Sequence, residues 1–177
     1  MLGGRQAGAL GDGGAFSFFP TKVMTTCEGG MITTDRDEED ELARSFRNQG
    51  KRGAKFGGLH HDLGGSLRIT ELGAAMGRIM LEKLPAMLDR REAAANEIIQ
   101  RLEAADLPYA RVSHMDKASH YKLVVLLPEG KDPAAVKQAL SDEGVMLGGT
   151  VYELPCHKQP VFEGRVPTGS FPMAERW

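Results

Sequence analysis

The apolar and polar positions in the first part of the chain predict two short strands followed by a helix. Residues 15–19 form a compact apolar run that a proline ends, which is typical of a buried strand. Residues 30–34 predict a second strand. We expect Asp35 or Asp37 to cap a helix that runs to about Asn48, because acidic side chains fill its first turn.

A long helix is predicted next, capped by Thr70 and extending to about Ala105. Its apolar side chains recur at helical spacing on one broad face. These residues are Leu72, Met76, Ile79, Met80 and Leu84. Pro85 lacks an amide hydrogen, so we expect the helix to kink or restart there.

The character of the chain changes near residue 108, where a small β-α-β unit is predicted to begin. Residues 121–127 and 145–151 have the composition of strands. Between them, an Asp-Pro pair predicts the start of a helix that a glycine ends. We therefore expect two partial domains, over residues 1–107 and 108–177.

Composition and charge exclude several classes of protein. The 177 residues carry a net charge of −2, which gives no bulk attraction to nucleic acid or membrane. No apolar run reaches the length of a transmembrane helix, and no signal peptide is recognisable. The two cysteines lie far apart in sequence, as expected of a reducing compartment. These features predict a soluble cytoplasmic protein.

Three familiar site patterns are weak in this sequence. The glycines before residue 15 lack the preceding strand and following helix of a dinucleotide fingerprint. Ser17 and Lys22 are five residues apart rather than one helical turn, which argues against a hydrolytic Ser-Lys pair. His60, His61 and Asp62 resemble metal ligands, but adjacent histidines point to opposite sides of an extended chain. No metal site is expected.

Lys22 is the one lysine between residues 8 and 35, and most of its neighbours are aromatic, apolar or hydroxyl-bearing. A dry environment favours the neutral amine, the form that reacts with an aldehyde. Ser17 offers a hydroxyl to a phosphate. An amine for an aldehyde beside a hydroxyl for a phosphate suggests pyridoxal phosphate, whereas an ordinary solvated lysine is the alternative.

The segment GDGGAFSFFPTKVMTTCEGGMITTD resembles the lysine segment of the DegT/DnrJ/EryC1/StrS sugar aminotransferases. The similarity continues through RNQG, LGGSLRITELGAAMGRIMLEKL and VYELPCHKQPVF. The resemblance implies an α/β fold of the fold type I pyridoxal-phosphate transferases. The chain would hold part of the large domain, with a mixed, mostly parallel sheet and helices, and part of the small C-terminal α/β domain.

The resemblance also implies roles for particular residues. Lys22 would bond the cofactor aldehyde and later move a proton, and Ser17 would bind the cofactor phosphate. Ser66 stands where the family has an asparagine that reaches the phosphate of the neighbouring subunit. Arg68 and His157 would face the substrate, although a structural ion pair is an equal alternative for Arg68.

The implied reaction moves an amino group, with glutamate as the expected donor, to a nucleotide-linked keto-sugar in a homodimer. A sugar dehydratase and a non-catalytic or regulatory relative remain open, although Lys22 argues against the dehydratase, in which a histidine replaces the lysine. The chain begins after the family segment that pairs with the pyridine nitrogen, and it lacks the end of the small domain. We expect such a fragment to be inactive by itself.

Overall fold

A computed structural model of the chain describes residues 1–53, 58–107, 117–128, 130–148, 154–166 and 169–175. The chain divides into two compact units, Met1–Pro128 and Glu129–Trp177, and each is considered by itself. The expected domain boundary at residue 108 lies outside the described residues and stays a prediction.

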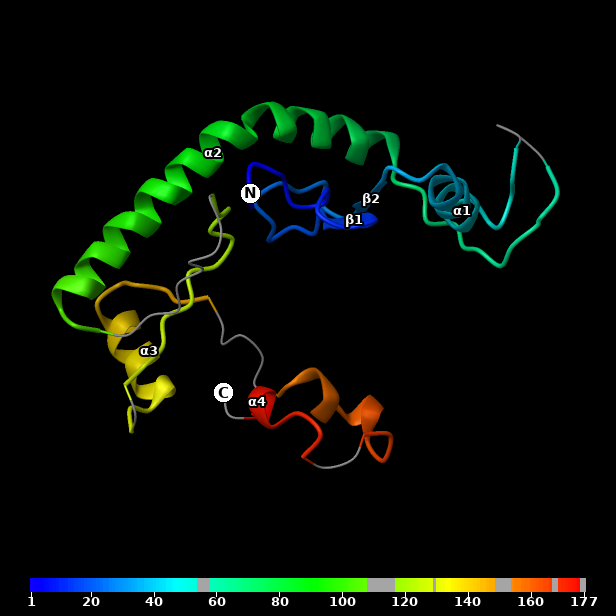
Figure 1. The fold of residues 1–177 in the computed structure, drawn as a ribbon. Helices are drawn as coiled ribbons and strands as arrows, with labels where there is room; N and C mark the ends of the chain where they lie inside the picture. Colours follow the sequence, from blue (N-terminus) through cyan, green and yellow to red (C-terminus); the bar gives the residue numbers. More distant parts are fainter. Residues whose placement is uncertain (54–57, 108–116, 129, 149–153, 167–168, 176–177) are drawn as a thin grey trace. The chain divides into compact units, whose positions relative to one another are not determined.

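Two antiparallel strands form the sheet of the first unit (Figure 1). β1 (Gly13–Ser17) pairs with β2 (Gly30–Thr34) so that Gly13 faces Thr34 and Ser17 faces Gly30. The prediction of a mostly parallel sheet is wrong for the described residues. β1 also ends two residues earlier than predicted. The Phe18 amide still bonds to Gly29, the next position of the ladder, at 2.9 Å, but the Phe18 carbonyl accepts from the Thr26 amide in the loop at 3.0 Å.

α1 (Asp37–Arg47) follows β2, and its acidic first turn suits the positive end of the helix dipole. The predicted caps are wrong, because the cap residue is Arg36, whose side chain makes no capping bond. The Thr34 hydroxyl instead accepts a hydrogen bond from the Arg36 amide at 3.1 Å. This bond ties the end of β2 to the start of the helix.

α2 (Glu71–Ala104) is a single helix of 34 residues, drawn as the curved green ribbon of Figure 1. As predicted, the Thr70 side chain caps it by accepting from the amide of Gly73 at 3.0 Å. The helix does not restart at Pro85, which lies inside it. Figure 1 shows its concave side toward β1 and β2, as expected of a helix that curves around what it packs against.

The packed face of α2 agrees in part with the predicted apolar face. Met76, Met80 and Leu84 are half-buried, as predicted, whereas Leu72 and Ile79 are 85% and 53% exposed. Gly73, Gly77 and Ala95 are buried. A Cβ atom on Gly77 would lie 2.9 Å from the Thr26 methyl group. The packed face therefore also includes small residues, which an apolar pattern does not count and which allow close approach.

The second unit contains short helices. α3 (Pro133–Asp142) is capped by Asp132, whose carboxylate accepts from the amide of Ala134 at 3.0 Å, as its Asp-Pro start predicts. The remaining elements are η1 (Cys156–Lys158), η2 (Pro160–Phe162) and α4 (Pro172–Glu175).

Neither strand predicted for the small domain is present among the described residues. Residues 121–127 belong to the first unit and form no strand with any other described segment, so the prediction of a strand there is wrong. Residues 145–148 are not a strand either, and the end of that predicted strand lies outside the described residues.

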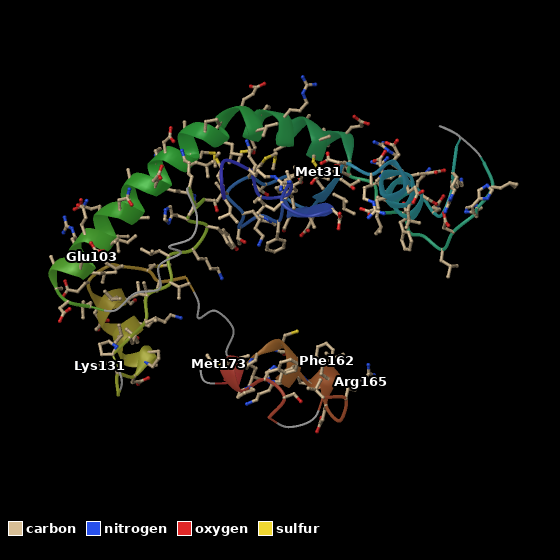
Figure 2. All side chains as sticks on the ribbon, viewed as in Figure 1. Met31, Glu103, Lys131, Phe162, Arg165 and Met173 are labelled. Atoms are coloured by element: carbon tan, nitrogen blue, oxygen red, sulfur yellow. The ribbon has the colours of Figure 1, made fainter. Side chains whose placement is uncertain are left out.

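Little apolar surface is buried in the described part of the chain. Only Phe18, Val23 and Ala95 are buried hydrophobic residues there. Met31, labelled on β2 in Figure 2, is 53% exposed, although it pairs with Phe16 across the sheet. No described helix combines the length and apolarity needed to cross a membrane.

Replacing Gly77 with leucine should destabilise the first unit. The new side chain would enter the space that the buried Thr26 occupies, and overpacking of this kind costs about 1–3 kcal/mol. Urea unfolding followed by circular dichroism measures the effect. Ala75→Leu is the matched control, because Ala75 is an exposed residue of the same helix and should change stability by less than about 0.5 kcal/mol. Equal losses in the two variants would contradict the close approach.

Candidate active site

The candidate site begins with the lysine loop, residues 18–29, which connects β1 to β2. The Phe18 carbonyl accepts two hydrogen bonds at 3.0 Å, from the Thr26 amide and the Thr25 hydroxyl. Phe18, Val23 and Thr26 are buried. These contacts hold both ends of the loop at the end of β1 and leave its middle to carry Lys22.

Lys22 closes a tight turn that begins at Phe19. Its amide donates to the Phe19 carbonyl at 3.0 Å, and Pro20 occupies the position that favours such a turn. The side chain is half-buried rather than enclosed in a dry pocket. Its Nζ lies 4.5 Å from the centre of the Tyr121 ring, and Thr21 Oγ1 lies 3.0 Å from the Tyr121 hydroxyl.

Ser17 is the last residue of β1 and is exposed. Its Oγ accepts a hydrogen bond from the Phe19 amide at 3.5 Å, which leaves the hydroxyl hydrogen available to another acceptor. This donor and the amine of Lys22 lie on one short stretch of chain. Binding of a phosphate by Ser17 stays a prediction.

Ser66 and Arg68 form a second group, together with Asn48 at the end of α1. The Arg68 guanidinium donates to Ser66 Oγ and to Asn48 Oδ1, both at 2.8 Å. Asn48 and Ser66 also form an isolated β-bridge. Among the described residues, no hydrogen bond or ion pair joins this group to Lys22 or Ser17. The predicted roles of Ser66 and Arg68 stay predictions.

The loop after α1 is organised around Asp62. Its carboxylate accepts from Arg52 at 2.7 and 2.8 Å and from the buried Ser45 hydroxyl at 2.5 Å. The Arg52 hydrogen bond, followed by that of Ser45, lowers the pKa of Asp62 from its ordinary 3.8 to about 2. Gly50 has a φ of +77°, and a Cβ there would lie 1.7 Å from the Asp62 carbonyl oxygen.

Two cations of this loop differ in what the structure describes. Arg52 is paired with Asp62, whereas Lys55 lies outside the described residues. His60 Nδ1 lies 2.7 Å from the Gln49 carbonyl. In the described part of the chain, no group of three side chains is placed to hold a metal ion.

His157 belongs to the second unit and lies in η1. Its ring is 4.8 Å from the ring of Phe171, centre to centre. Its predicted role toward a substrate stays a prediction.

Tyr121 and Asn48 are the neighbours of the predicted residues that sequence reasoning missed. Tyr121 lies 99 positions beyond Lys22 and inside a segment that its composition predicts to be a strand. Asn48 belongs to the RNQG segment, which carried part of the family resemblance but suggested no role for Asn48 itself. No local spacing links either residue to its partner, since each contact depends on how distant segments fold.

The whole sequence, residues 1–177, matches the profile of the DegT/DnrJ/EryC1/StrS aminotransferase family. It is 32% identical to UDP-N-acetyl-3-dehydro-alpha-D-glucosamine 3-aminotransferase of Acidithiobacillus ferrooxidans, over 99% of this chain and 46% of that protein. It is 32% identical to dTDP-3-amino-3,4,6-trideoxy-alpha-D-glucose transaminase of Streptomyces venezuelae, over 97% of this chain and 44% of that protein.

Comparison with solved structures gives the same family. The structure of S. venezuelae DesV superposes with a TM-score of 0.81 at 32% identity, covering 98% of this chain and 46% of DesV. The chain thus spans about half the length of the relatives that it matches. Over that half, the chain has the fold of the fold type I sugar aminotransferases.

Replacing Arg52 with glutamine should raise the pKa of Asp62 from about 2 toward 3.8, because the first of its stabilising partners is lost. A carboxyl ¹³C titration by NMR measures the midpoint. In the intact chain, a depressed pKa means that Asp62 stabilises the fold above about pH 3.8 and loses that effect as pH falls toward 2.

Arg44→Gln is the matched control, because Arg44 pairs with Asp40 rather than with Asp62. It should leave the Asp62 midpoint unchanged. An unaltered midpoint in Arg52→Gln would rule out the ion pair as the cause of the low pKa.

Proposed function

The chain belongs to the DegT/DnrJ/EryC1/StrS aminotransferase family, and on that premise we propose that it is part of a pyridoxal-phosphate-dependent sugar aminotransferase. The family's enzymes act on nucleotide sugars, and the two relatives described above carry nucleotide-sugar names. We propose a nucleotide-linked keto-sugar as amino acceptor and an amino acid, glutamate, as donor.

Lys22 is the residue on which the proposal depends. Its amine is half-buried, it lies on a loop that buried residues hold at a strand end, and no described carboxylate pairs with it. An amine without a carboxylate partner can lose its proton and attack a carbonyl carbon. The predicted hydroxyl and amine, on Ser17 and Lys22, lie close together in sequence, where β1 passes into the lysine loop.

The residues present suit pyridoxal phosphate by the chemistry of their donors. The amine of Lys22 would hold the aldehyde carbon, and the Ser17 hydroxyl would donate to a phosphate oxygen. When bound, this cofactor withdraws electrons from a bond at the substrate carbon. Once released, the Lys22 amine would move a proton between the substrate carbon and the cofactor carbon on the other side of the transferred nitrogen.

Ser66 and Arg68 would complete a site of a second copy of the chain in a homodimer. Arg68 donates to Ser66 Oγ, so the Ser66 hydroxyl hydrogen remains free for a phosphate oxygen. In the described structure these residues share no contact with Lys22 of the same chain, which fits a role across an interface.

Cys27 and Cys156 are both free and exposed, which suits the reducing cytoplasm.

Lys22 should be the residue that borohydride reduction fixes to pyridoxal phosphate. Peptide mass spectrometry after reduction should find the label on Lys22, and Lys22→Arg should reduce total labelling at low cofactor concentration by about tenfold or more, since guanidinium does not form this bond.

The matched control is Lys83→Arg, on the exposed surface of α2. It should leave the labelling unchanged. Labelling spread evenly over the exposed lysines, with none preferred, would refute the proposed site and favour a non-catalytic relative.

A further inference from the structure

Tyr121 contacts two consecutive residues of the lysine turn. Its hydroxyl shares a 3.0 Å hydrogen bond with Thr21 Oγ1, and its ring centre lies 4.5 Å from Lys22 Nζ. A cation at this distance from an aromatic ring is held by the charge distribution of the ring. Lys122 lies farther from the same ring, at 5.7 Å. Lys22 is thus the nearer of the two lysines to the ring.

The segment that carries Tyr121 is itself anchored to the middle of α2. Lys117 Nζ lies 3.2 Å from an Asp89 carboxylate oxygen and 3.6 Å from one of Glu92. The Arg91 guanidinium donates to the His120 carbonyl at 3.2 Å. These contacts fix the backbone on the N-terminal side of Tyr121.

His120 adds an independent sign that the position of Tyr121 is imposed. Its φ is +44°, a conformation that side-chain-bearing residues seldom adopt. Such a conformation persists where surrounding contacts fix it. Here it immediately precedes the residue that contacts Lys22.

The Tyr121 phenol responds to these neighbours. The Thr21 hydrogen bond lowers its pKa most, and the charges of Lys22 and Lys122 lower it further, while burial acts in the opposite direction. The Tyr121 hydroxyl therefore takes part in the contact, in addition to the ring contact with Lys22.

We propose that Tyr121 is a positioning residue that holds the side chain of Lys22 in one direction, through its ring and through the Thr21 hydroxyl. The inference rests on the proposed role of Lys22 as the aldehyde-binding amine. An aromatic ring can hold the Lys22 side chain without placing a carboxylate beside the reacting amine.

The direct test is NMR of the full chain carrying ¹³C at the lysine ε carbons, with Lys22→Arg to assign the Lys22 signal. No cofactor is added. The Lys22 ε protons should be shifted upfield by the Tyr121 ring in the native chain and in Tyr121→Phe, which keeps the ring. The shift should disappear in Tyr121→Leu. An unshifted Lys22 signal in the native chain would overturn the proposal.

A second readout measures the reactivity of the amine with formaldehyde and a borohydride reductant. The rate at Lys22, relative to exposed Lys83, should rise about two- to fivefold in Tyr121→Leu, the effect of losing an exposed cation–π contact. It should stay within about twofold in Tyr121→Phe. Equal rates in the native and leucine chains would contradict the proposal.

Thr21→Val covers the case in which Tyr121→Leu fails to fold. It removes the hydroxyl bond alone, so amide exchange at the Lys22 turn should accelerate while the ring shift of Lys22 persists. Unchanged exchange would contradict the tether. Since none of these measurements uses pyridoxal phosphate, their failure is distinguishable from failure of the cofactor labelling at Lys22.

Discussion

The close approach of α2 to the lysine loop at Gly77 is the constraint on which the candidate site depends. A helix rises about 1.5 Å per residue, so an unbroken α2 fixes the distance between Gly77, against Thr26, and Arg91, against His120. A break at Pro85 would let these two contacts move independently. The continuity of the helix therefore brings Lys22 and Tyr121 together, although 98 residues separate them in sequence.

The sequence predicted the elements whose signals are local. The β2 strand, the Thr70 cap and the helix after Asp132 were all correct, because each depends on neighbouring residues. Predictions failed where distant contacts decide the outcome. The Phe18 carbonyl bonds to Thr26 in the loop rather than to the opposite strand, Pro85 is accommodated within α2, and residues 121–127 lack a described partner strand. Lys22 could be singled out by its neighbours in sequence, whereas Tyr121 could not.

The described chain exposes much apolar surface around a small buried core. Leu63, Leu67 and Leu72 are 92%, 70% and 85% exposed, close in sequence to the Ser66 and Arg68 group. Leucines this exposed, grouped along one stretch of chain, would suit the proposed homodimer, in which a second copy covers them. This observation agrees with a site divided between two groups of residues, of which Lys22 and Ser17 form one and Ser66 and Arg68 the other.

A crystal structure determined with pyridoxal phosphate tests the central claim most directly. The account predicts continuous electron density from Lys22 Nζ to the aldehyde carbon, with the phosphate within hydrogen-bond reach of Ser17 Oγ. Density joined to a different lysine, or a Lys22 side chain turned into solvent and away from Ser17 with the cofactor bound elsewhere, would contradict it.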